Sequence, residues 1–264
     1  MRAAGLVVAL AACSEPAEVQ ALAEASTEVS FEAVDGLGPH HLLGRLRTTA
    51  HPDSGPPFTT DEVLEIRWQD WDNFEYRRST DGKLTTALVT SGGVAWQREG
   101  DDRWEERPDA EPYRVELRHA WSLWDTALEP FRDRISFTDK GEERMEGRGV
   151  RRYGLSLTPE PPAEEAPGDG TAAGRAKSRK RARPAPPVRP RTLEGDVWVD
   201  AATAVRLMAD VRGEAEHRGV RREIHLQLTR SEVGQDQPIS PPPADERRKR
   251  RQGPGGPDPA PRTP

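Results

Sequence analysis

Histidine and carboxylate side chains are the groups of this chain whose types could do chemistry, but their spacing does not form a catalytic or metal site. No histidine belongs to a His-Glu-x-x-His pattern, and the adjacent pair His40-His41 would point to opposite faces of a strand. We therefore expect all six to be solvated surface residues: His40, His41, His51, His119, His217 and His225. Carboxylates in runs such as Gly141-Glu142-Glu143 are typical of solvated loops. The sequence has no Gly-x-Ser-x-Gly elbow, phosphate-binding loop or dinucleotide-binding fingerprint. We expect neither an enzyme nor a bound metal or cofactor.

The single cysteine, Cys13, has surroundings that do indicate a reaction. It follows Leu10-Ala11-Ala12 and ends an apolar run that begins after Arg2. A basic start, a short apolar core and small residues at the end are typical of a secretory signal, too short to span a bilayer. Leu-Ala-Ala-Cys resembles the lipobox of bacterial lipoproteins, which implies cleavage before Cys13 and acylation of its sulfur and its new amino group. The alternative is an ordinary signal peptide with an incidental cysteine.

The first thirty residues thus divide into a signal peptide, residues 1–12, and a lipidated tether, residues 13–30, which is small, acidic and rich in alanine. Ser14 follows the cysteine, and by resemblance to enterobacterial sorting this permits transfer to the outer membrane. We expect a lipid-anchored protein of the bacterial envelope, at the outer membrane and facing the periplasm. With one cysteine it has no internal disulfide.

Short runs that alternate apolar and polar residues predict an antiparallel meander from residue 31 onward. Leu64, Ile66 and Trp68 alternate with polar neighbours, which predicts a strand with one buried face and one solvated face. Asp81-Gly82 is typical of a two-residue hairpin turn. Alternation returns over 145–157, 196–200, 205–211 and 224–228, whereas 135–138 is expected to be a short connector. These patterns predict a sheet in which neighbours in sequence pair.

One segment has the spacing of a helix. Its apolar residues recur three or four positions apart, which places them on one face of a helix. They are Tyr113, Leu117, Trp121, Trp124, Leu128 and Phe131. Pro112 suits the first turn and Pro130 suits the end. The pattern predicts one long amphipathic helix within the sheet sequence.

Composition sets the limits of the folded region. Only 34% of the residues are hydrophobic, 32% are charged and 25 are proline, so part of the chain is expected to be unpacked. Residues 159–191 are rich in proline, lack aromatic side chains, and change from acidic to basic. We expect a disordered linker there, inside a β-sheet domain that spans residues 31–232. Residues 233–264 are expected to be a disordered, proline-rich basic tail.

The sequence Val197-Trp198-Val199-Asp200-Ala201-Ala202-Thr203, together with the meander and its one helix, resembles the LolA/LolB-like superfamily of envelope lipoprotein carriers, receptors and lipid-binding lipoproteins. The resemblance covers about residues 28–158 and 192–232. It implies an α+β fold, in which a strongly curved antiparallel sheet, an unclosed barrel, packs around a central amphipathic helix. After the threonine the superfamily often has Gly-Leu-Pro, where this chain has Ala204-Val205-Arg206.

The function that follows is non-catalytic binding of a lipid or a lipidated polypeptide in a concave apolar face. Seven tryptophans could wall such a face, or they could simply fill the core. The expected ligand-binding residues come from the sheet and the helix: Leu64, Ile66, Trp68, Leu117, Trp121, Trp124 and Leu128. The alternative is a structural or interaction lipoprotein with a filled core, whose basic proline-rich segments contact envelope partners.

The expected partners are the membrane, through lipid on Cys13, and a lipid or lipoprotein ligand. The basic stretch Arg175–Arg183 could contact anionic head groups, although a solvated linker explains its composition equally well. An envelope protein rarely meets nucleic acid, so none is expected. The protein is expected to be a monomer.

Overall fold

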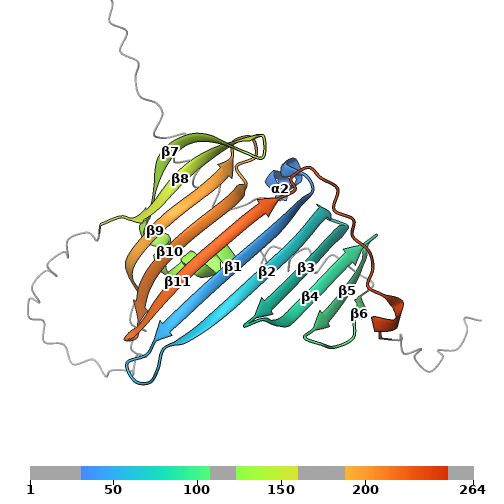
Figure 1. The fold of residues 1–264 in the computed structure, drawn as a ribbon, viewed down its shortest axis with the longest axis horizontal. Coiled ribbons are helices and arrows are strands. Elements are labelled where there is room, and N and C mark those ends of the chain that lie inside the picture. The colour runs from blue at the N-terminus through green and yellow to red at the C-terminus, as the bar shows by residue number, and fades with distance from the viewer. Residues whose placement is uncertain (1–30, 108–122, 160–187, 249–264) are drawn as a thin grey trace, which may run out of the picture. The chain divides into compact units, whose positions relative to one another are not determined.

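The computed structural model describes residues 31–107, 123–159 and 188–248. Within these ranges, eleven antiparallel strands form one sheet in the order β6-β5-β4-β3-β2-β1-β11-β10-β9-β8-β7 (Figure 1). In the described ranges β6 and β7 are its two end strands, so the sheet is not closed. This confirms the predicted open antiparallel sheet. None of the described helices has the length and apolarity needed to cross a lipid bilayer.

The chain divides into two compact units. Unit 1 comprises residues 1–36, 48–59 and 124–228, and unit 2 comprises residues 37–47, 60–123 and 229–264. The strands of unit 2 are β1 (His40–His51), β2 (Phe58–Asp70), β3 (Asn73–Thr80), β4 (Lys83–Ser91), β5 (Val94–Glu99) and β6 (Glu105–Arg107), the first two continuing into residues of unit 1.

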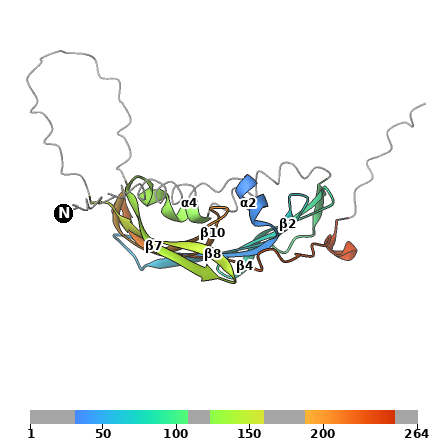
Figure 2. The same ribbon diagram turned by 90° about the horizontal axis from the view of Figure 1, so that it is seen from above.

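Unit 1 has its helices on one face of its strands (Figure 2). The strands are β7 (Ile135–Met145), β8 (Arg148–Leu157), β9 (Arg189–Asp200), β10 (Arg206–His217) and most of β11 (Val220–Ser231). The helices are α2 (Phe31–Leu37), α4 (Leu123–Leu128) and the 3-10 helix η1 (Glu129–Arg134). The structure differs from the sequence-based expectations at three places. Helix α2 begins where a strand pattern was expected, β7 replaces the connector expected at 135–138, and β9 begins at Arg189 within the predicted linker.

Several hairpins close with two residues in left-handed conformation, the geometry that matches the twist of antiparallel strands. At the predicted turn between β3 and β4, Asp81 has φ 51° and Gly82 has φ 74°. Glu146-Gly147 and Arg218-Gly219 repeat the geometry, with φ values from 50° to 83°. Glycine at the second position costs nothing in this conformation. The turns therefore fix the register of the strands on either side.

The predicted helix is only partly described. Its residues 113–122 lie outside the described ranges, and the described part is α4 followed directly by η1. Pro130, within η1, lacks the N–H that a continuing α-helix would need. This is a physical reason for the tighter 3-10 turn.

The first part of the predicted disordered tail is placed against unit 2. Residues 233–248, which we call the C-terminal strap, include the 3-10 turn η2 (Ala244–Glu246) and a parallel bridge between Trp104 and Arg247. Ile239 packs on a buried cluster of Ala87, Val89, Trp96 and Trp104. The expectation of a tail from residue 233 is corrected for this stretch, because apolar contact and backbone pairing hold it. The remainder, 249–264, lies outside the described residues.

Candidate functional site

The three ligand-binding residues predicted on the sheet lie together on one face of unit 2. Leu64, Ile66 and Trp68 alternate along β2 and are each at most 1% exposed. The neighbouring strand continues this face, because Trp68 pairs with Phe74 and Ile66 pairs with Tyr76. We call this surface the inner face of unit 2. It is an apolar layer in which aromatic rings are concentrated at the Trp68 end.

That aromatic end contains close ring contacts. The Trp68 ring stacks on Phe74 with centroids 6.0 Å apart, and Trp71 meets Trp68 edge-on at 4.3 Å. Such arrangements suit the quadrupoles of the rings. Trp68 and Phe74 are buried, so any ligand must replace the contacts that now cover them.

Polar groups are buried beside these rings. His40 is 0% exposed and its ring centroid lies 6.3 Å from that of Trp68. Thr90, also 0% exposed, lies directly across from Phe74, and Arg230 is 3% exposed. The expectation that all histidines are solvated is therefore wrong for His40. Its strand neighbour His41 does point to the other face, as the alternation predicted, and bonds to Glu65 at 3.0 Å.

The helix residues predicted for ligand binding have two different outcomes. Leu117 and Trp121 lie outside the described residues. Trp124 and Leu128 belong to the core of unit 1, at 2% and 3% exposure. Trp124 and Leu128 belong to unit 1, whereas the predicted sheet residues Leu64, Ile66 and Trp68 belong to unit 2. The contacts of each unit are therefore described separately.

Helix α4 is attached to β10 by an unusual pair. The guanidinium carbon of Arg206 lies 4.4 Å from the centre of a Trp124 ring, a cation–π contact of a desolvated cation. Burial lowers the pKa of Arg206 to about 10, while the nearby Asp125 carboxylate opposes that shift, so the side chain stays charged at neutral pH. Sequence reasoning missed this residue, because nothing in the alternation of β10 marks an arginine as buried.

The 3-10 helix η1 is seated on the same strand by shape. Phe131 is 1% exposed, and a Cβ added at Gly213 would come within 2.7 Å of its ring. Gly213 therefore provides the space that the ring occupies. This contact places η1 on the face of β10 that carries Leu207, Ala209 and Val211.

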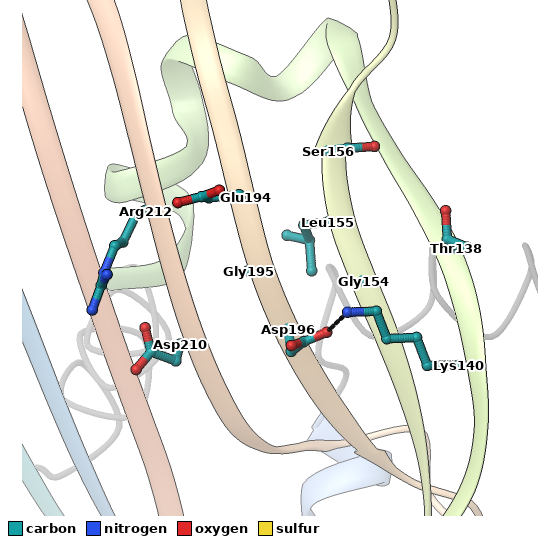
Figure 3. A pocket seen from close by; sticks show the side chains of 10 residues that line it. All are labelled: Thr138, Lys140, Gly154, Leu155, Ser156, Glu194, Gly195, Asp196, Asp210 and Arg212. Atoms are coloured by element: carbon teal, nitrogen blue, oxygen red, sulfur yellow. Dashed lines mark hydrogen bonds and ion pairs between the residues drawn. The ribbon is translucent and has the colours of Figure 1, made fainter.

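Strands β7 to β10 carry a polar depression of about 740 Å³ on the face opposite α4 and η1. Figure 3 shows its lining side chains, with the ion pair between Lys140 and Asp196. Arg152 donates to the second carboxylate oxygen of Asp196 at 2.7 Å, and His225 and Gln227 occupy both oxygens of Asp210. Burial opposes ionisation of Asp196, but the bonds from Arg152 and Lys140 outweigh it and hold its pKa below the usual value. Because these charged groups pair with one another, they do not indicate any class of ligand.

The sequence that carried the family resemblance folds into a polar turn. Asp200, 2% exposed, accepts hydrogen bonds from the backbone N–H and hydroxyl of Thr203 at 2.9 and 2.8 Å, and from Arg148 Nε at 3.0 Å. Ala204 follows in left-handed conformation, with φ 58°. Burial disfavours the carboxylate, yet the bonds from Arg148 and Thr203 lower the pKa of Asp200. The role of this motif is structural, since it fixes the turn from β9 into β10.

No group of three or more histidine, cysteine, aspartate or glutamate side chains that could hold a metal ion occurs in the described residues. The candidate site is therefore the inner face of unit 2, an apolar surface with a few buried polar atoms beside it. Such surfaces bind by burial of apolar area and orient their ligand by hydrogen bonds.

Comparison with known proteins gives likenesses among solved structures. Lipoprotein LppX of Mycobacterium tuberculosis is 16% identical over 86% of this chain and 100% of its own, with a TM-score of 0.32. A LolA superfamily protein from Nitrosomonas europaea is 9% identical over 80% of this chain and 92% of its own, with a TM-score of 0.23. A chain of the Pseudomonas aeruginosa MucA/MucB complex is 10% identical over 82% of this chain and 58% of its own, with a TM-score of 0.24.

No protein-family model and no curated protein matches the chain. The resemblance to LolA-like lipoprotein domains that the sequence indicates is found again among the solved structures. Since all three TM-scores are below 0.5, function has to be inferred from the side chains described above.

Proposed function

We propose that this chain is an envelope lipoprotein that binds a lipid or a lipidated polypeptide, without catalysis, on the inner face of unit 2. The observation that carries the proposal is the unbroken apolar surface made by Leu64, Ile66 and Trp68 with Phe74 and Tyr76. Acyl chains are attracted to such a surface by roughly 25 cal/mol per Å² of apolar area removed from water. Because these side chains are buried, ligand binding exchanges one apolar contact for another.

The anchor in this proposal is lipid on Cys13, the residue after Leu-Ala-Ala. It holds the protein at the bacterial envelope, on the periplasmic side of the outer membrane. A tethered domain of this kind can take up a lipid that leaves the bilayer without crossing much water. Leu117, Trp121, Trp124 and Leu128 are proposed as further ligand-binding residues from their helical spacing in the sequence alone.

A second candidate function has its own support. Trp124, Leu128 and Phe131 fill the core of unit 1, and the proline-rich strap lies on Trp96 and Trp104. A structural or interaction lipoprotein with a filled core would have these features. Its basic segments, Arg175–Arg183 and Arg247–Arg251, would then contact envelope partners.

Native mass spectrometry of protein extracted from bacterial membranes separates the two. The carrier proposal expects a co-purified lipid that is reduced in an Ile66→Ser variant. A Leu43→Ser variant is the matched control, because Leu43 lies on the opposite face of the adjacent strand and is 46% exposed. Both variants are first checked for folding by circular dichroism. Absence of lipid from the wild type, or equal lipid in both variants, supports the interaction lipoprotein instead.

A further inference from the structure

Two buried side-chain atoms on the inner face of unit 2 have no hydrogen-bond partner among the described residues. They are Nε2 of His40 and Oγ1 of Thr90, each on a side chain with 0% exposure. An unsatisfied buried polar atom costs about 1–3 kcal/mol, so its presence in a folded protein requires a reason. A ligand that supplies the missing partner is one such reason.

The two atoms are ends of one row across the sheet. His40 lies beside Trp68, Trp68 pairs with Phe74, and Phe74 pairs with Thr90. The stacked rings of Trp68 and Phe74 therefore lie between the two polar groups. All four residues belong to unit 2, as does Arg230, whose positive charge acts on the His40 ring.

The hydrogen bond at the other ring nitrogen decides what His40 can bind. Nδ1 of His40 lies 2.9 Å from the carbonyl oxygen of Gly38. A carbonyl can only accept, so Nδ1 carries the hydrogen and Nε2 of the neutral ring presents a lone pair. Burial, with the charge of Arg230, lowers the pKa of His40 to about 3, so the ring stays neutral at physiological pH. Nε2 is therefore an acceptor that needs a donor.

This requirement distinguishes between lipid head groups. A carboxylate or a phosphate diester offers only acceptor oxygens, which would face the lone pair of Nε2. A hydroxyl group can donate to Nε2 and at the same time accept a hydrogen bond from another donor. A small head group that bears hydroxyls can also lie against the Trp68 ring beside His40.

We propose that His40 and the Trp68 ring beside it bind the uncharged, hydroxyl-bearing head group of a lipid, such as the glycerol of an acylglycerol, with the acyl chain on Ile66 and Leu64. The inference rests on the proposed function, since it assigns the head group of the same ligand. It adds a specificity that apolar burial alone does not provide.

Binding of chain-matched lipids to the delipidated full chain tests it. Isothermal titration is carried out with 1-monolauroylglycerol and with laurate below their critical micelle concentrations. We expect the monoacylglycerol to bind about tenfold or more tightly, which corresponds to one additional buried hydrogen bond. A His40→Phe variant should lose this preference while it still binds laurate within about twofold of the wild type.

Control variants keep the result interpretable. His41→Phe changes the neighbouring histidine on the opposite face and should leave the preference intact. Because His40→Phe also removes the bond to Gly38, its unchanged affinity for laurate is the check that the apolar surface is still formed. Thr90→Val, at the other end of the row, should leave the preference intact. A preference that survives in His40→Phe, or equal wild-type affinities for the two lipids, would overturn the head-group assignment and leave the proposed function standing. If neither lipid binds the wild type, both proposals fail.

Discussion

Replacement of Asp200 by asparagine tests whether the turn after β9 holds unit 1 together. The carboxylate accepts two bonds from Thr203 and one from Arg148, and only 2% of the side chain is exposed. Asparagine has nearly the same shape but carries no charge, so the pairing with Arg148 is lost. One bond to a charged group contributes about 1.5–3 kcal/mol. We expect Asp200→Asn to lower the free energy of unfolding by about 2–3 kcal/mol at pH 7.

The stability difference between the wild type and Asp200→Asn should depend on pH in a definite direction. The folded-state pKa of Asp200 is lowered, because the bonds from Arg148 and Thr203 outweigh the effect of burial. A group with a lowered pKa stabilises the fold fully above its unfolded-state pKa, about 3.9 for aspartate. The stabilisation is lost as pH falls through the folded-state pKa. The difference between wild type and variant should therefore be largest above about pH 5 and should narrow below about pH 4.

Urea denaturation followed by circular dichroism at several pH values measures this difference. Asp101→Asn is the matched control, because it removes the same charge from an exposed position in the turn after β5. A cost for Asp200→Asn below about 0.5 kcal/mol, or one that does not change with pH, would refute this explanation of the turn.

Three further predictions concern other parts of the molecule. Gly213→Ala should destabilise the protein by about 1–3 kcal/mol in urea denaturation, because the new methyl group meets Phe131. Adding Phe131→Leu should recover part of this cost, and simple additivity of the two changes would contradict the contact. A chain that ends at Gly234 should unfold at lower temperature than one that ends at Arg248, with red-shifted tryptophan fluorescence as Trp96 and Trp104 lose the strap. Unchanged melting would mean that the strap contributes no stability. Cys13→Ala should move the protein from the detergent phase to the aqueous phase on Triton X-114 partitioning, and unchanged partitioning would remove the proposed anchor.

The sheet could largely be predicted from the sequence, because alternation and turn chemistry are local signals. Asp81-Gly82 fixes a hairpin through backbone conformation alone, and Leu64, Ile66 and Trp68 mark a buried face by their spacing. Strand β7 could not be recognised in this way. Its sequence is rich in charge and it is an end strand of the described sheet, with most of its side chains partly or fully exposed. Hydrogen bonds to β8 define it where hydrophobic periodicity does not.

Buried polar side chains were beyond sequence reasoning. Histidine usually lies at the surface, whereas His40 is buried beside the Trp68 ring from another strand. Arg206 is likewise buried through its contact with Trp124. Such residues are recognised only when the strands that surround them are known.

The strap was missed for a different reason. Its prolines cannot pair in a strand and are typical of unfolded chains, so composition indicated a disordered tail. A weak local signal was present, because Ile239 and Pro242 are three positions apart, the period of a polyproline II helix. Ile239 packs on the tryptophan cluster, Pro242 is buried, and Arg247 lies 5.2 Å from the Trp96 ring.

Fluorescence quenching by a brominated lipid tests the central claim, that an acyl chain lies on the inner face of unit 2. Bromine quenches only tryptophans that it contacts, so monoacylglycerol brominated along its chain is titrated into wild type, Trp68→Phe and Trp198→Phe proteins. Trp198 is the control, because it lies on the opposite face of its own strand from Val197 and Val199, where its indole N–H donates to Glu143. The proposal predicts saturable quenching that falls clearly in Trp68→Phe and persists in Trp198→Phe. Quenching that is absent, or that is lost with Trp198 and not with Trp68, would contradict it.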